Sequence, residues 1–64
     1  MNGKAILKIL KKSGWVIIRV KGSHYHLFNA ALSKNVTVPV YGKKDLKIKT
    51  VKSIERATQV KLLK

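Results

Sequence analysis

Two histidines lie two residues apart in the segment His24-Tyr25-His26. An imidazole side chain ordinarily has a pKa of about 6.5, so it can accept or release a proton near neutral pH. In a strand, both side chains would project from one face with their Cα atoms roughly 6.5–7 Å apart. Such a pair could perform general acid–base chemistry or hold a metal ion. No third metal ligand is evident, so we expect no metal site, and a solvated histidine without a role is the plain alternative.

The charge of the chain indicates what these histidines could act on. Its 64 residues include 15 Lys and Arg but only two acids, Asp45 and Glu55, which gives a formal net charge of +13. A field this positive favours polyanions, with nucleic acid first and acidic membranes or acidic proteins as alternatives. Charge alone supplies affinity without sequence specificity, because phosphate contacts do not read bases.

Length and composition restrict the fold and the chemistry. The length predicts one domain over residues 1–64. The absence of cysteine excludes disulfides, cysteine-based zinc sites and thiol nucleophiles. No apolar run approaches the ~20 residues of a membrane span, and no secretory segment is evident. We therefore expect a cytoplasmic protein with no cofactor and no membrane partner.

An amphipathic helix is predicted over residues 4–12. Its apolar stripe is Ile6, Ile9 and Leu10, and its lysines fall on the opposite side. Asn2 is a suitable N-cap, and Gly14 is a suitable stop signal. A short basic helix of this kind can bind membranes, but the strand-like segments that follow favour a globular domain.

Three strands are predicted to follow, over residues 15–21, 24–29 and 35–40. The first two form a hairpin through the turn Lys21-Gly22-Ser23. In the third, Val36, Val38 and Val40 share one face, which we expect to be buried. Pro39 places this strand at a sheet edge or marks its end.

A second helix is predicted from about Thr50, which can act as its N-cap. Its buried face would consist of Val51, Ile54 and either Ala57 or Thr58. The tail, residues 61–64, could continue this helix or fray. The order αβββα predicts an α+β fold of two layers, with both helices on one face of an antiparallel sheet. The other face is left open and available for function.

Strand alternation assigns residues of the second strand to these faces. Tyr25 and Leu27 suit the core, which places His24 and His26 on the open face. Phe28 would join the histidines unless a bulge or the strand end returns it to the core. In the third strand, Thr37 takes the open face.

The first strand is ambiguous. Val16, Ile18 and Val20 compete with Trp15 and Ile17 for the core, and we expect Trp15 in the core or at its rim rather than as a base-stacking platform. If the valine face is buried, Arg19 and Lys21 join His24 on the open side.

Several motifs together carry a family likeness over nearly the whole chain. The sequence resembles the HicA family of toxin mRNA interferases in the following run: Gly14-Trp15, Lys21-Gly22-Ser23-His24, Val36-Thr37-Val38-Pro39, Lys44-Asp45-Leu46-Lys47, and Thr50 before a short amphipathic helix. This resemblance implies a double-stranded-RNA-binding-domain-like αβββα fold and ribosome-independent cleavage of mRNA. It also implies a HicB antitoxin as partner and identifies His24 as the essential histidine.

The chain departs from the family pattern at three positions. Tyr25 and Tyr41 stand where many members have histidine, and Lys49 stands where many have glycine. None of these differences removes His24, and Lys49 becomes an added phosphate contact or only an added surface charge.

Cleavage of RNA without a metal uses the 2′-hydroxyl as nucleophile, a base, an acid and cations that offset charge on the phosphorane. We expect His24 to transfer one proton; His26, Tyr41 and water are candidates for the second transfer. The candidate RNA contacts are Arg19, Lys21, Gly22, Ser23, Lys44 and Lys47, of which Gly22 would offer its amide. Any single lysine could instead be a solvated charge.

Two other functions are compatible with the sequence. One is a double-stranded-RNA-binding module without catalysis, in which the basic connection before the second helix straddles phosphates. The other is a small ribosome-associated protein. In the toxin interpretation, we expect an acidic antitoxin to cover the open face and His24 with it.

Overall fold

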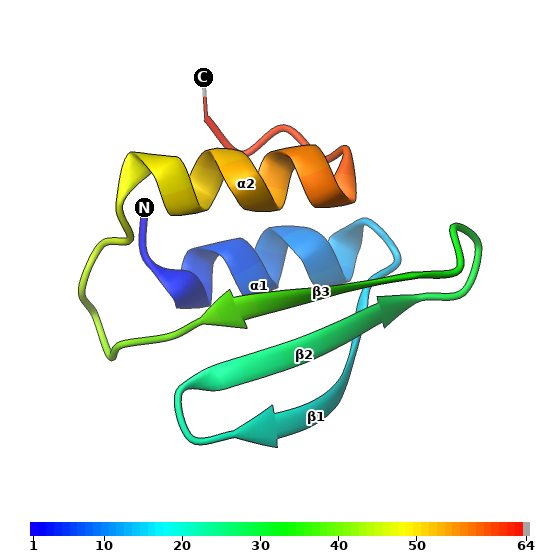
Figure 1. Ribbon diagram of the computed structural model, residues 1–64, viewed down its shortest axis with the longest axis horizontal. Helices are drawn as coiled ribbons and strands as arrows, with labels where there is room; N and C mark the ends of the chain where they lie inside the picture. The colour runs from blue at the N-terminus through cyan, green and yellow to red at the C-terminus, as the bar shows by residue number, and fades with distance from the viewer. Residues whose placement is uncertain (64) are drawn as a thin grey trace.

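The computed structural model describes residues 1–63 and confirms the αβββα order. Helix α1 is followed by three strands and helix α2 (Figure 1). The elements are α1 Gly3–Lys12, β1 Val16–Lys21, β2 His24–Asn29, β3 Lys34–Pro39 and α2 Ile48–Thr58. This is the α+β, double-stranded-RNA-binding-domain-like arrangement that the sequence predicts.

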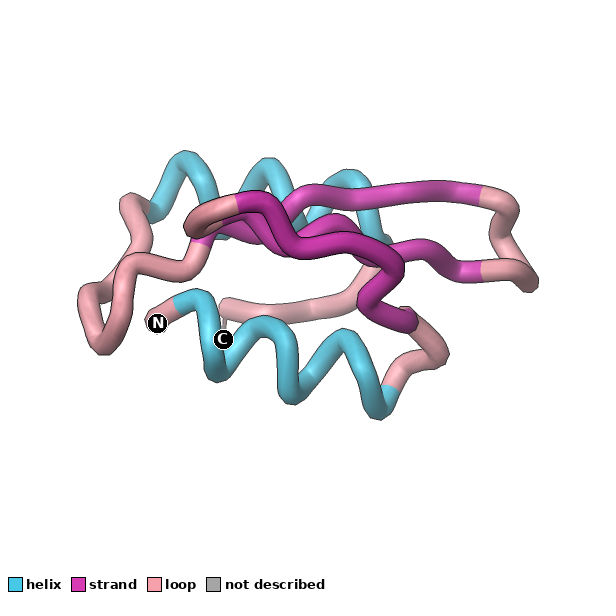
Figure 2. The backbone as a smooth tube through the Cα atoms, turned by 90° about the horizontal axis from the view of Figure 1, so that it is seen from below, coloured by secondary structure: helices cyan, strands magenta, loops and turns pink. Residues whose placement is uncertain are grey.

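The three strands form one antiparallel sheet in the order β1-β2-β3. In Figure 2, α1 runs along one side of the strands, and Figure 1 shows α2 beyond β3. Strand β3 is an edge strand and ends at Pro39, so both expectations for this proline are confirmed. β2 is therefore the central strand, so His24 and His26 each have a paired strand on both sides.

Helix α1 begins and ends with the predicted signals. The Asn2 side-chain oxygen accepts a hydrogen bond from the Ala5 amide at 2.9 Å, and Gly14 follows the helix with a φ of +92°. A left-handed residue after the C-cap suits glycine, which lacks a Cβ. The N-cap and the stop signal read from the sequence are thus confirmed.

One apolar core joins the helices to one face of the sheet. Trp15 is only 2% exposed, so the expectation of a core tryptophan is confirmed. Val36 and Val38 are buried and Val40 packs against them, as the alternation of β3 predicts. The buried cluster consists of Ile6, Leu7, Leu10, Trp15, Leu27, Val36, Val38, Leu46, Val51, Ile54 and Leu62.

Helix α2 begins earlier than predicted. Its N-cap is Lys47, whose side chain makes no capping hydrogen bond, and the Val51 amide donates to the Lys47 carbonyl at 3.1 Å. Thr50 lies inside the helix, so its expected role as the cap is wrong. The buried face consists of Val51, Ile54 and Thr58, which agrees with the apolar spacing.

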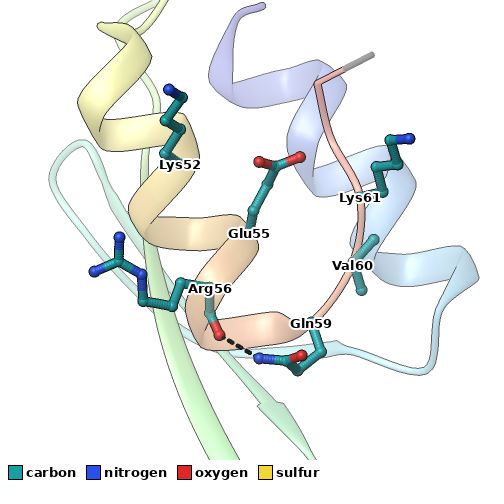
Figure 3. Close-up of a pocket in the computed structure, with 6 residues that line it drawn as sticks. All are labelled: Lys52, Glu55, Arg56, Gln59, Val60 and Lys61. Atoms are coloured by element: carbon teal, nitrogen blue, oxygen red, sulfur yellow. Dashed lines mark hydrogen bonds between the residues drawn. The ribbon is translucent and has the colours of Figure 1, made fainter.

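The tail neither continues α2 nor frays over its described residues. The helix ends at Thr58, and Gln59 adopts a left-handed conformation with φ +60°. The Glu55 carboxylate then accepts hydrogen bonds from the amides of Leu62 at 2.5 Å and Leu63 at 2.7 Å. Figure 3 shows Glu55 on α2 beside the tail. The tail therefore returns along α2 and buries Leu62; Lys64 lies outside the described residues.

The N-terminus is held against the connection between β3 and α2. The Met1 carbonyl accepts from the Leu46 amide at 2.9 Å, and its amino group lies 3.4 Å from the Asp45 carboxylate. Gly3 packs so closely on the end of β3 that a Cβ there would overlap the Pro39 carbonyl oxygen. Within residues 1–63, neither helix has the length and apolar character needed to cross a membrane.

Candidate functional site

The open face of the sheet centres on the two histidines of β2. His24 lies opposite Lys21 of β1 and Pro39 of β3, and it is exposed to solvent. Residues directly opposite each other in an antiparallel pair project from the same face. His24 is therefore flanked by a cation on one side and by the end of β3 on the other.

His26 occupies the next position along the same face. It lies opposite Arg19 on β1 and Thr37 on β3. The Thr37 hydroxyl is 3.0 Å from Nδ1 of His26, which is within hydrogen-bond distance. Each histidine therefore has one basic residue across the β1–β2 ladder, and His26 is additionally held by a side-chain hydrogen bond.

A β-bulge in β1 produces this arrangement. Ile17 pairs with Leu27, but the next paired residue is Arg19, opposite His26, so Ile18 is the extra residue. Without the bulge, Ile17 and Arg19 would face the same side. The bulge lets Ile17 pack on the core while Arg19 and Lys21 face outward, which confirms the expected side for both cations.

The sequence placed Arg19 and Lys21 on the open side on the condition that the valine face of β1 is buried. That condition is wrong, because this face is not buried. Val16 is 61% exposed, Ile18 58% and Val20 52%. Trp15 and Ile17 supply the core contacts instead. Phe28 lies opposite Val16 and stays on the open face, half-buried, so neither a bulge in β2 nor the strand end returns it to the core.

The turn before His24 has a defined conformation. Gly22 has a φ of +58°, and a Cβ added to it would meet no atom within 4 Å. The left-handed backbone, and not a lack of room for a side chain, thus explains the glycine. The carbonyl of Ser23 accepts from the Val40 amide at 2.7 Å, which ties the turn to the end of β3.

Lys44 and Lys47 occupy the connection after β3, and both are exposed. Lys47 lines a hollow together with Pro39, the residue opposite His24. The hollow is lined by Pro39, Tyr41, Asp45, Leu46, Lys47 and Thr50. Lys44 lies in the turn closed by its amide and the Tyr41 carbonyl, 3.1 Å apart, and it does not line the hollow. Lys47 and Pro39 therefore line the same hollow, at the end of β3.

Two features of this face were missed from the sequence. The hydrogen bond between Thr37 and His26 depends on the β2–β3 register, which loop length alone did not specify. The hollow depends on the path of residues 40–47, which has no periodic pattern. The one signal for the hydrogen bond between Thr37 and His26 was the expectation that both side chains lie on the open face.

The fold and this face define a class of small, basic αβββα domains with an open sheet face that carries histidines and cations. The chain belongs to the HicA toxin family: the family model described as HicA toxin of bacterial toxin-antitoxin matches residues 3–62 of the 64. No curated protein matches the sequence.

Membership of this family gives the general function. The protein is the toxin of a toxin–antitoxin system, and the family consists of RNase toxins. Family membership also implies, in general terms, an RNA substrate and an antitoxin partner.

Proposed function

We propose that this protein is a ribosome-independent mRNA interferase, and that it uses His24 as a proton-transfer residue without a metal ion. The observation that carries this proposal is the position of His24. It is exposed, follows a left-handed glycine turn, and lies directly opposite Lys21 on the uncovered sheet face. A phosphate bound by Lys21 would therefore lie within reach of the imidazole.

The chemistry follows from RNA itself. The 2′-hydroxyl attacks the adjacent phosphorus while the bond to the 5′-oxygen breaks, so one proton must leave the 2′-oxygen and another must reach the leaving oxygen. His24 performs one of these transfers. Cations next to the phosphate stabilise the negative charge that develops on the phosphorane.

The phosphate contacts in this proposal come from three segments of the chain. Arg19 and Lys21 face outward from β1, and Gly22 and Ser23 form the turn. Lys44 and Lys47 belong to the connection before α2. An 11-residue helix starts after Lys47 with no acid in its first turn, so the positive end of the helix dipole reinforces the charge there.

The partner in this proposal is a HicB-type antitoxin that docks on the same face. The net charge of +13 favours an acidic protein, and a protein over the sheet would block His24 and neutralise the cations together. Both partners would meet in the cytoplasm, where mRNA is available.

The test is to incubate the purified protein with single-stranded RNA in EDTA, without ribosomes. We expect cleavage to products that end in a 2′,3′-cyclic phosphate, and no cleavage of DNA or of RNA methylated at the 2′-oxygen. Cleavage of either blocked substrate would contradict the 2′-hydroxyl mechanism. RNA that shifts on a gel but stays intact would favour a non-catalytic RNA-binding module.

A further inference from the structure

We propose that His26 is the second proton-transfer group, the acid that protonates the leaving 5′-oxygen while His24 takes the proton of the 2′-hydroxyl. This inference rests on the proposed function, since it assigns a partner to His24 in the same reaction. Its basis is the position of His26, its hydrogen bond to Thr37 and its pairing with Arg19.

The two histidines are spaced to reach opposite sides of one phosphate. His24 and His26 project from the same face of the central strand, with Tyr25 between them facing the core side. Their Cα atoms are two residue positions apart along the strand, roughly 6.5–7 Å. The attacking and leaving oxygens of a phosphodiester lie on opposite sides of the phosphorus, so a base and an acid must approach from two directions. Two imidazoles at this separation can lie on either side of one phosphate.

The imidazole of His26 is oriented by its neighbour on β3. The Thr37 hydroxyl lies 3.0 Å from Nδ1 of His26, which leaves Nε2 as the nitrogen free for a substrate. A hydroxyl can donate a hydrogen bond to a neutral ring nitrogen or accept one from a protonated nitrogen. The contact can therefore persist in both protonation states, as an acid that gives up and regains a proton requires.

Each histidine also has a basic residue across from it on β1. Arg19 lies directly opposite His26, and Lys21 lies directly opposite His24. Opposite residues in an antiparallel pair have Cβ atoms about 4.5–5.5 Å apart. Each imidazole therefore has one cation beside it, and the guanidinium of Arg19 can bind two phosphate oxygens at once. The β1 bulge at Ile18 places Arg19 on this face.

Tyr41 does not share this position. It lies beyond the end of β3, 51% exposed, and lines the hollow with Leu46 and Lys47. No strand pairing holds its side chain beside His24 within the described residues. His26 is thus the candidate that the sheet itself positions.

In the proposed step, one bond to phosphorus forms and one breaks. The bond between the 2′-oxygen and phosphorus forms, and the bond between phosphorus and the 5′-oxygen breaks. The 2′-hydroxyl proton passes to His24, and the proton on Nε2 of His26 passes to the 5′-oxygen. The products are a 2′,3′-cyclic phosphate and a free 5′-hydroxyl, and proton exchange with water restores both imidazoles.

The test compares H26Q and H24Q on two RNAs after the wild-type cleavage site has been mapped. One RNA is ordinary, and the other has sulfur in place of the 5′-oxygen at that site. A thiolate leaves without protonation, so an acid becomes dispensable. We expect H26Q to lose about 10²–10⁴-fold on ordinary RNA and to recover nearly wild-type cleavage on the sulfur substrate. H24Q should be slow on both.

Each result separates the two proposals. Wild-type cleavage of ordinary RNA by H26Q, or an equal loss on both substrates, would overturn the role of His26 and leave the proposed function standing. Failure of the wild-type protein to cut ordinary RNA at the mapping stage would overturn both.

A second pair of variants tests the positioning of His26 if H26Q does not fold. Thr37 is exposed, so T37V should fold normally, lower kcat and leave KM unchanged. T37S keeps the hydroxyl and should restore kcat. Wild-type kcat in T37V would overturn the proposed role of the hydrogen bond, and so would failure of T37S to restore it.

Discussion

Arg19 of β1 lies directly opposite His26 of β2, on the open face of the sheet. Regular alternation would give Arg19 the same side as Ile17, which packs against the core. The extra residue Ile18 reverses this relation and brings a guanidinium next to an imidazole. A local irregularity in an edge strand thus builds part of the site.

The bulge predicts the outcome of a deletion. Removing Ile18 should leave a regular strand in which Ile17 still faces the core and Arg19 still faces His26, because Ile18 is the unpaired residue. We expect the variant to keep its fold and to bind RNA with nearly wild-type affinity, measured by circular dichroism and gel shift.

Deletion of Val20 is the matched control. It shortens the same strand by one residue but places Lys21 on the side that Val20 occupies, opposite Tyr25. RNA binding should weaken in this variant. A deletion of Ile18 that unfolds the protein, while the Val20 deletion does not, would contradict the account of the bulge.

The sequence was sufficient to predict those parts of the fold that depend on local patterns. The Asn2 cap, the Gly14 stop and the alternation of Val36 and Val38 each rest on neighbouring residues, and each is confirmed. The side of the sheet on which Arg19 lies was predicted correctly but for the wrong reason, because the valine face of β1 that was expected to be buried is exposed. Alternation cannot reveal a bulge, because an extra residue changes the parity without changing the composition.

The second helix and the tail show a different limit. Thr50 has the side chain of a cap, but the helix begins at Ile48 after an uncapped Lys47. The tail is held by Glu55 through hydrogen bonds seven and eight residues apart in sequence. Side chains that bond to a distant backbone leave no periodic signal. The bond between His26 and Thr37 joins two side chains on different strands, so it became visible only with the strand register.

Removal of Lys21 should weaken RNA binding. K21A removes the cation opposite His24. We expect the slope of log K against the logarithm of the salt concentration to decrease in magnitude by about 0.7–1, where K is the association constant for RNA. The matched control is K8A, since Lys8 is exposed on α1, outside the sheet. Fluorescence anisotropy at several salt concentrations measures both slopes. Equal slopes for the two variants would contradict a specific phosphate contact at Lys21.

Gly3 is required where α1 meets the end of β3. In G3A, the new Cβ would overlap the Pro39 carbonyl oxygen and come within 2.8 Å of a Val40 methyl carbon. Overpacking of this kind costs about 1–3 kcal/mol, and the better helix propensity of alanine does not offset it at a helix end. Urea denaturation should show this loss for G3A and little change for K4A, because Lys4 is exposed. Wild-type stability of G3A would contradict the close contact.

The tail gives the protein a stability that depends on pH. The amides of Leu63 and Leu62 lower the pKa of Glu55 below its ordinary value by bonding to the charged carboxylate. A lowered folded-state pKa stabilises the fold at pH values above the ordinary carboxyl range, and this contribution is lost as the pH falls through the folded pKa.

Substitution of Glu55 tests this linkage. E55Q should melt below wild type at pH 7, and the difference in Tm should shrink as the pH falls below about 4.5, the ordinary glutamate range. D45N is the control. It removes the other acid of the chain, whose side chain is 77% exposed and pairs with the N-terminal amino group, and an ion pair this exposed contributes little to Tm at any pH. A Tm difference for E55Q that stays constant from pH 7 to pH 3 would show that the carboxylate charge does not hold the tail.

The central claim is that His24 transfers a proton in RNA cleavage, and H24Q tests it most directly. RNA affinity is measured by titration of the protein, and the single-turnover cleavage rate is then measured on the same preparation at saturating protein. Because His24 is exposed, the variant should fold normally and bind RNA within about threefold of wild type, since the substitution leaves every Lys and Arg in place for phosphate contacts. Its single-turnover cleavage should fall by about 10²–10⁴-fold. Cleavage by H24Q at the wild-type rate would contradict the account.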